Sequence, residues 1–149
     1  MIETLIIYST TDGQTIKICN KLAEENSNEN VKLCPLNDAV QEDLNSYNKI
    51  IIGASIRYGK HNQNVLNFVK KNIKILSNVK TAFFSVNVVA RKKKKSTPST
   101  NPYVIKFIKK TNWQPTKIGV FAGKVDYPSY RLFDKHIIRF IMWLTKGPT

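Results

Sequence analysis

The sequence lacks several features that would place it in a specialised class of protein. No stretch approaches the roughly 18 consecutive apolar residues of a membrane-spanning helix. The N-terminus has no basic flank, long apolar run or cleavage site of a signal peptide. The two cysteines, Cys19 and Cys34, match no metal-site spacing, and a cytosolic disulfide is rare. We therefore expect a cytoplasmic protein without a metal, in which both cysteines are small buried hydrophobic residues.

Acidic residues are scarce in the second half of the chain. Residues 1–75 carry nine Lys or Arg and eight Asp or Glu, whereas residues 76–149 carry fifteen and two. The whole chain has a net charge of +14. Such asymmetry indicates an acidic partner, which could be nucleic acid, an anionic membrane surface or an anionic small molecule. A genomic bias toward lysine would explain Lys in place of Arg, but not the lack of acids in one half.

The pattern of apolar residues predicts strands that alternate with helices in a single domain, residues 1–149. The expected strands are 2–8, 31–36, 49–53, 81–86 and 117–122, and the expected helices are 13–26, 38–44, 62–76, 101–111 and 132–144. This alternation implies right-handed crossovers and a parallel sheet that is covered on both faces. Five strands favour an α/β, flavodoxin-like, doubly wound parallel sheet over the six-stranded dinucleotide folds.

The turn after the first expected strand is rich in hydroxyl groups. It consists of Ser9, Thr10, Thr11, Asp12, Gly13, Gln14 and Thr15. At the carboxyl end of a strand, the N-terminus of the next helix offers N–H groups and a partial positive charge to a phosphate. Gly13 allows close approach of the backbone, and the loop lacks the lysine of nucleoside-triphosphate loops. One or two hydroxyls would suffice to cap the helix, so four favour a phosphate site.

With this loop in place, the sequence resembles a known family. The loop is similar to the FMN phosphate loop of flavodoxins, and four more segments resemble the flavodoxin-like, menaquinone-dependent protoporphyrinogen IX dehydrogenases of bacterial haem synthesis. These segments are residues 52–59, 84–91, 97–98 and 122–131. The resemblance extends from Leu5 to about Gly147. It implies an oxidoreductase that removes six electrons from protoporphyrinogen IX, in three two-electron steps, and passes them through FMN to a membrane quinone.

The resemblance also implies a role for individual residues. Residues 9–15 would hold the FMN phosphate, and two further segments would flank the isoalloxazine ring. The ring segments are Ala54, Ser55, Ile56, Arg57, Tyr58, Gly59, Ser85, Val86, Asn87, Val88, Val89, Ala90 and Arg91. After Gly123, about residues 124–149 correspond to a family insertion implicated in contact with substrate and membrane, including Tyr127, Tyr130 and Arg131. Because family members continue into a final helix, we expect this chain to lack that helix and to expose one face of its sheet.

Two arginines are predicted beside the flavin ring. Reduced flavin is anionic at N1, and nearby cations favour the charged form of a group. Arg57 and Arg91 would therefore stabilise the two-electron-reduced flavin relative to the acidic sites of flavodoxins. The alternative for Arg57 is an exposed salt bridge, and the alternative for Arg91 is simple membership of a solvated run of charges.

Two segments could contact a membrane. The first is the cationic run Lys92, Lys93, Lys94 and Lys95, which could instead contact the two propionates of the porphyrin. Each lysine near an anionic bilayer contributes about 1 kcal/mol, although most such runs are solvated loops. The second is the stretch 132–144, whose apolar residues accompany Arg139, Phe140 and Trp143. It is too short to span a bilayer and fits an interfacial helix, with a core helix as the alternative. Both segments favour a peripheral protein on the cytoplasmic face of the bacterial inner membrane.

Three functions remain open from the sequence. The first is the quinone-dependent protoporphyrinogen IX dehydrogenase, and the second is a basic FMN electron carrier or another quinone reductase. The third is a nucleic-acid-binding module, which needs aromatic residues among its cations and leaves residues 9–15 without a role. We therefore expect no nucleic-acid partner. His61 and His136 belong to no recognisable acid–base constellation, so the sequence identifies no catalytic residue.

Overall fold

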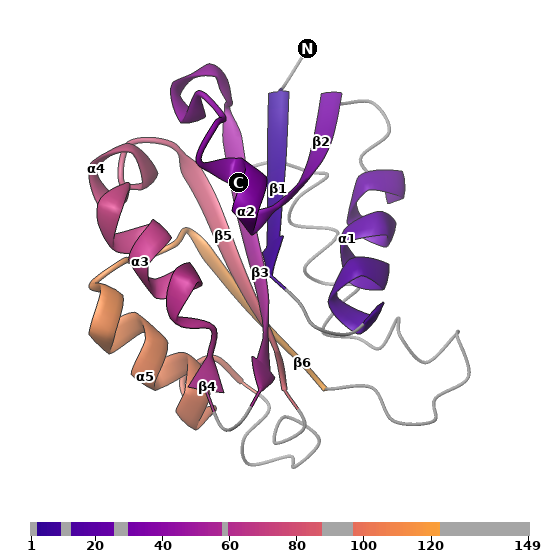
Figure 1. The fold of residues 1–149 in the computed structure, drawn as a ribbon. Coiled ribbons are helices and arrows are strands. Elements are labelled where there is room, and N and C mark those ends of the chain that lie inside the picture. Colours follow the sequence, from indigo (N-terminus) through magenta and orange to yellow (C-terminus); the bar gives the residue numbers. More distant parts are fainter. Residues whose placement is uncertain (1–2, 10–12, 26–29, 58–59, 88–96, 123–149) are drawn as a thin grey trace.

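A parallel sheet forms the centre of the computed structural model, which describes residues 3–9, 13–25, 30–57, 60–87 and 97–122 (Figure 1). The parallel strands are β1 (Glu3–Ser9), β2 (Asn30–Pro35), β3 (Lys49–Arg57), β5 (Lys80–Asn87) and β6 (Lys117–Ala122). Their order is β2-β1-β3-β5-β6. The chain adds strands on one side of β1 and then on the other, so the sheet reverses its direction of growth between β1 and β3. The predicted flavodoxin-like, doubly wound fold is confirmed.

A short antiparallel strand at the end of β3 was not predicted. β4 (Lys60–His61) pairs with β3, with Ile56 opposite His61 and Arg57 opposite Lys60. β3 therefore continues beyond the expected strand 49–53 as far as Arg57. The apolar run in the sequence ends earlier because the last residues of β3 include Ser55 and Arg57, and polar residues hide a strand from a search for apolar runs.

Two of the expected helices are found as predicted, and two others differ in extent or are divided. α1 (Gly13–Glu25) and α5 (Pro102–Thr111) occupy the expected positions. The expected helix 62–76 is instead divided into α3 (Gln63–Lys71) and α4 (Ile73–Leu76). The division occurs at Asn72, whose side chain donates a hydrogen bond to the carbonyl of Phe68. A side-chain amide that binds the local backbone in this way competes with regular helix formation.

The expected helix 38–44 is also wrong in its extent. α2 (Leu36–Ala39) begins two residues earlier, and the 3-10 helix η1 (Leu44–Ser46) follows after a turn. Both pieces are short, and their buried residues are Leu36, Ala39 and Leu44. These few apolar contacts give too little periodicity for the sequence to define the ends of either piece.

Helices lie on both faces of the sheet, and the expectation that one face is exposed is wrong, because Ile6, Ile51 and Phe84 on the α1 face are buried. In β1, Leu5 and Ile7 belong to the core cluster that includes residues of α3 and α5, whereas Ile6 belongs to the cluster that includes residues of α1. Successive side chains of a strand point to opposite faces, which explains this alternation. Figure 1 shows α1 on one side of the sheet, and α3 and α5 on the other.

Both cysteines are free and buried, Cys19 in α1 and Cys34 in β2. Burial raises the pKa of the Cys19 thiol to about 12 and also raises the pKa of the Cys34 thiol. A buried thiol with a raised pKa forms little reactive thiolate at neutral pH. The prediction that both act as small hydrophobic residues is therefore supported. Among the described residues, no group of three His, Cys, Asp or Glu side chains could hold a metal ion.

The expected helix 132–144 and the expected insertion after Gly123 lie outside the described residues. In the part of the chain that the structure describes, no helix is both long enough and apolar enough to cross a membrane.

Candidate functional site

Three of the predicted cofactor segments come together at the carboxyl edge of the sheet. The register of the strands places Ser9 opposite Ala54, Ala54 opposite Ser85, and Ser55 opposite Val86. The carboxyl ends of β1, β3 and β5 therefore lie side by side (Figure 1). The edge includes the point between β1 and β3 where strand order reverses, and ligands of open α/β sheets bind in the crevice at this point.

A buried hydroxyl without a partner marks the α1 side of this edge. Thr15 lies in the first turn of α1 and is fully buried, with 0% of its surface exposed. Its hydroxyl has no hydrogen-bond partner among the described residues. Leaving such a group unsatisfied costs about 1–3 kcal/mol. The N–H groups of a first helical turn also lack intrahelical acceptors and carry a partial positive charge. Thr15 and the start of α1 therefore fit the phosphate site predicted for residues 9–15.

The rest of the predicted phosphate loop is only partly described. Ser9 is the half-buried last residue of β1, and Gly13 and Gln14 open α1. Thr10, Thr11 and Asp12 lie outside the described residues.

The first predicted ring segment follows the end of β3. Ala54 and Ser55 are buried and Ile56 is half-buried, while Arg57 ends the strand opposite Lys60. Tyr58 and Gly59 lie outside the described residues.

The second predicted ring segment begins inside β5. Ser85 and Val86 are buried, and Asn87 is the last residue of the strand. Val88, Val89, Ala90 and Arg91 lie outside the described residues.

Gly53 has a packing role directly beneath this edge. A Cβ atom at this position would overlap the ring of Phe84, which is fully buried. The Phe84 ring also packs against Phe121, with 5.6 Å between the ring centroids. Glycine at position 53 therefore admits an aromatic side chain against the backbone of β3.

His61 connects the two predicted ring segments on the face of the sheet opposite that of Phe84. Its Nε2 atom lies 2.8 Å from the Oγ atom of Ser85, and only 4% of its surface is exposed. Its ring meets Phe83 and Phe107 edge-on, with centroid distances of 5.7 and 5.2 Å. Because β4 pairs with the end of β3, this hydrogen bond connects the β3–β4 hairpin to β5.

Burial lowers the pKa of His61 to about 4, so its imidazole is neutral at neutral pH. A neutral, enclosed imidazole suits a residue that positions the two segments better than one that takes protons from a substrate. No role could be assigned to His61 from the sequence, because its contact with Ser85 depends on the unpredicted strand β4. The one signal in the sequence that could have identified His61 is its position shortly after the predicted ring segment 54–59.

A cavity of about 310 Å³ lies elsewhere, between α2 and α3. Its walls include Leu36, Val40, Asn64 and Phe68. None of the predicted cofactor residues lines it, so it is separate from the carboxyl edge.

The residues predicted to contact substrate or membrane lie outside the described residues. They are Lys92, Lys93, Lys94, Lys95, Tyr127, Tyr130, Arg131, Arg139, Phe140 and Trp143.

Comparison with known proteins agrees with this arrangement. The sequence matches the family model of the flavodoxin domain over residues 5–149. A Leishmania major protein named protoporphyrinogen IX dehydrogenase (quinone) is 43% identical over 99% of this chain. A protein of the same name from Escherichia coli strain K12 is 40% identical over 99% of the chain. This chain spans 65% of the length of the first relative and 82% of the length of the second.

Solved structures show the same fold. The flavodoxin of Fusobacterium nucleatum, bound to flavin mononucleotide, superposes with a TM-score of 0.59 and is 16% identical, covering 98% of each chain. Strand order and the family match agree with one another. The chain therefore belongs to the flavodoxin domain family, in which the two protoporphyrinogen IX dehydrogenases are its relatives.

Proposed function

We propose that this chain binds FMN at the carboxyl edge and oxidises protoporphyrinogen IX to protoporphyrin IX, with a membrane quinone as electron acceptor. The names of two relatives with 43% and 40% identity support the reaction. The observation that carries the proposal is the meeting of the phosphate and ring segments at one edge, beside the buried and unpartnered hydroxyl of Thr15.

The proposed reaction balances with three quinones for each porphyrinogen. Protoporphyrinogen IX loses six hydrogen atoms, and each quinone gains two and becomes a quinol. When bound, FMN would carry two electrons at a time from the porphyrinogen to the quinone. The protein would position the reactants and set the electrostatic environment of the flavin.

The residues of the chain then have separate tasks. Residues 9–15 would bind the phosphate, with Thr15 and the first-turn N–H groups of α1 as donors. Residues 54–59 and 85–91 would enclose the ring, and His61 would hold these two segments together through Ser85. Arg57 and Arg91 would stabilise negative charge on the reduced ring.

The proposed partners are protoporphyrinogen IX, menaquinone or ubiquinone, and an anionic membrane surface. A quinone dissolved in the bilayer requires the enzyme to work at the membrane, which favours a peripheral position on the cytoplasmic face of the bacterial inner membrane. Residues 92–95 and 132–144, together with Tyr127, Tyr130 and Arg131, remain predicted contacts for substrate or membrane.

A second candidate function is that of an electron carrier or of a quinone reductase with another substrate. The likeness of fold to a flavodoxin favours it, because the same edge could hold FMN without a porphyrinogen site. Fold alone does not decide between these activities.

An anaerobic assay tests the proposal. The purified chain is supplied with FMN, protoporphyrinogen IX and a soluble menaquinone analogue, and porphyrin fluorescence is recorded. We expect porphyrin to form only when both FMN and quinone are present. Bound FMN without quinone-dependent porphyrin formation would favour the second candidate, and failure to bind FMN would contradict both.

A further inference from the structure

One flank of the molecule carries exposed lysines on helices that contain no acidic residue. The sequence contains no Asp or Glu between Asp43 and Asp126. This stretch includes α3, α4 and α5, whose exposed lysines include Lys70, Lys74, Lys106, Lys109 and Lys110. We call these five residues the lysine face.

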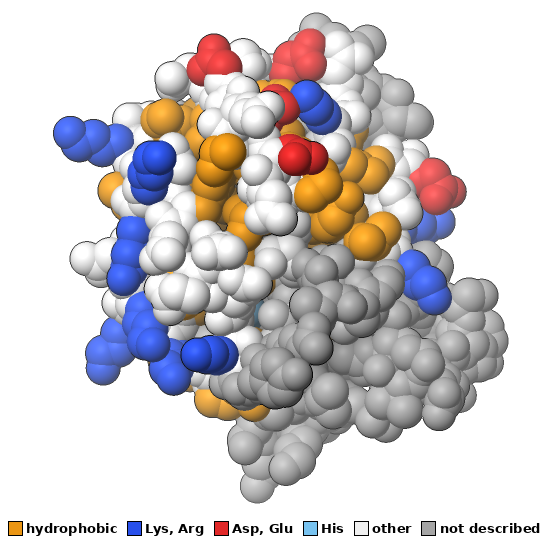
Figure 2. All heavy atoms as spheres, in the orientation of Figure 1, with side chains coloured by type: hydrophobic (Ala, Val, Ile, Leu, Met, Phe, Trp, Pro, Cys, Tyr) orange, Lys and Arg blue, Asp and Glu red, His pale blue; other side chains and the backbone are white. Residues whose placement is uncertain are grey.

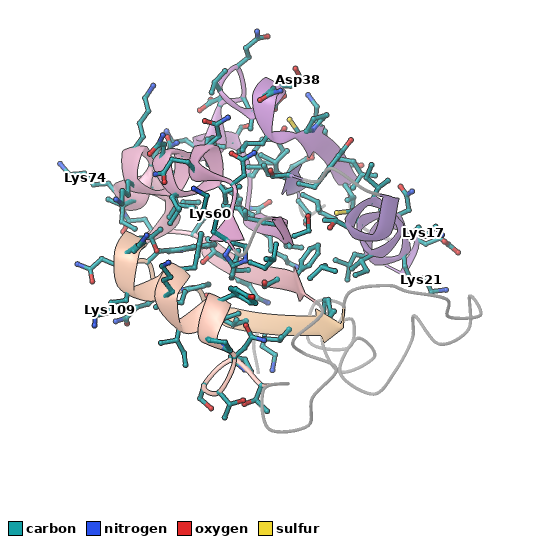
Figure 3. The ribbon with its side chains drawn as sticks, turned by 60° about the horizontal axis from the view of Figure 1, so that its bottom comes forward. Lys17, Lys21, Asp38, Lys60, Lys74 and Lys109 are labelled. Carbon is teal, nitrogen blue, oxygen red and sulfur yellow. The ribbon has the colours of Figure 1, made fainter. Side chains whose placement is uncertain are left out.

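The helices that carry the lysine face lie together on one side of the sheet. Val69 of α3 and Phe107 of α5 are buried in the same core cluster, and the two helices pack against each other. Figure 2 shows Lys and Arg side chains along the flank where Figure 1 places α4, α3 and α5. In Figure 3, Lys74 and Lys109 lie on this side, whereas Lys17 and Lys21 of α1 lie on the opposite side.

The charges of the lysine face are not balanced by acids of its own helices. Along the described chain, the last acidic residue before α3 is Asp43. The neighbouring Glu42 already has hydrogen-bond partners outside the lysine face. Glu42 accepts hydrogen bonds from Lys32 and Tyr47, at 2.6 Å each. A concentration of one sign of charge on a surface attracts a partner of the opposite sign.

The surroundings of the lysines favour lipid over nucleic acid. Ile105 is exposed on α5 beside Lys106 and Lys109, with 46% of its surface accessible. Apolar and basic side chains on one exposed helix side suit the headgroup boundary of a bilayer. Non-specific binding of single-stranded nucleic acid uses aromatic stacking, but Phe68 and Phe107 of these helices are buried, and only Tyr103 among their aromatic residues is half-buried.

We propose that the lysine face is the surface on which this protein lies against an anionic lipid bilayer. The inference rests on the proposed function, which requires a membrane quinone to reach the carboxyl edge. The flank approaches that edge at the exposed Lys60 of β4, next to the predicted ring segment 54–59. Binding through the lysine face would hold the edge close to the bilayer, independently of residues 92–95 and 132–144.

Two charge-matched variants of the full chain test this surface. The first combines Lys74→Glu with Lys109→Glu on the lysine face, and the second combines Lys17→Glu with Lys21→Glu on α1. Co-sedimentation uses vesicles of phosphatidylglycerol and phosphatidylcholine in equal parts, with pure phosphatidylcholine vesicles as a reference. We expect the affinity of the first variant for the anionic vesicles to fall by a factor on the order of 30 or more. The second variant should bind these vesicles with nearly the affinity of the unaltered chain.

Several outcomes would overturn the proposal. They are equal weakening by both variants, unchanged binding by the first variant, or binding of the unaltered chain to neutral vesicles as strongly as to anionic ones. Tighter binding to duplex DNA than to anionic vesicles at physiological salt would assign the lysine face to nucleic acid instead. Lys74→Gln with Lys109→Gln repeats the test with neutral side chains, and circular dichroism checks that each variant is folded.

The soluble-quinone assay separates this inference from the proposed function. Because that assay needs no bilayer, we expect the Lys74→Glu, Lys109→Glu variant to keep its activity there. Lack of activity in the unaltered chain would contradict the proposed function, whereas the vesicle comparison reports only on the surface.

Discussion

The two sides of the carboxyl edge differ in how their buried polar groups are satisfied. On the side of α3 and α5, His61 and Ser85 form a buried hydrogen bond of 2.8 Å. On the side of α1, the buried hydroxyl of Thr15 has no partner among the described residues. Both regions lie at the end of the same parallel sheet and are equally inaccessible to water.

We interpret this difference as one between structural support on the His61 side and the proposed binding site on the Thr15 side. A paired buried group stabilises the protein by itself, whereas an unpaired one lowers stability until a ligand supplies its partner. The His61 side of the edge should therefore respond to mutation through folding stability. The Thr15 side should respond through ligand affinity, with little change in the stability of the FMN-free protein.

The largest expected effect is a loss of stability at low pH through His61. Its folded-state pKa of about 4 lies below the ordinary value of 6.5, so the unfolded chain binds the proton more tightly. The stability from the neutral imidazole is complete above pH 6.5 and is lost as the pH falls toward 4. The full difference is about 3 kcal/mol. Urea unfolding at several pH values, compared with the non-titrating variant His61→Gln, measures it. An equal loss in both proteins would contradict this account.

A smaller effect is expected from Ser85→Ala. The substitution leaves Nε2 of the buried His61 without the Ser85 hydroxyl and should lower the free energy of unfolding by about 1–3 kcal/mol. Ser77→Ala is a control, because its exposed hydroxyl bonds only to the carbonyl of Ile73 in the local helix. Equal free energies of unfolding for Ser85→Ala and the unaltered protein would show that the His61 contact contributes nothing.

The smallest effect on stability is expected from Thr15→Val, measured by urea unfolding without FMN. The valine removes an unpaired hydroxyl, so the free energy of unfolding should stay equal or rise. Thr111→Val provides the contrast, because the Thr111 hydroxyl donates to the carbonyl of Phe107 at 2.9 Å. Loss of that bond should cost about 1 kcal/mol. A larger loss for Thr15→Val than for Thr111→Val would mean that Thr15 has a structural partner.

Much of the fold follows from local pattern in the sequence. The apolar runs of β1, β5 and β6, and the helical spacing in α1, are long enough to identify these elements. Alternation of strands and helices then predicts the parallel sheet and places residues 9–15, 54–59 and 85–91 at one edge. The approximate position of the site was therefore predictable before any side chain was placed.

The remaining details depend on contacts between distant residues. The bond between His61 and Ser85 joins positions 24 residues apart and requires the short strand β4. The division of the helix at Asn72 depends on one side-chain hydrogen bond to Phe68. Four hydroxyls in residues 9–15 predicted a phosphate site, but only burial distinguishes Thr15 as a group that lacks a partner.

The central claim is that the start of α1 binds the phosphate of FMN with the help of Thr15. Calorimetric titration of the FMN-free protein with FMN and with riboflavin, which lacks the phosphate, tests it most directly. We predict that the unaltered chain binds FMN more tightly than riboflavin. Thr15→Val should weaken FMN binding roughly 10-fold to 100-fold and leave riboflavin binding unchanged. Equal affinity for FMN and riboflavin in the unaltered chain, or full FMN affinity in Thr15→Val, would contradict the account.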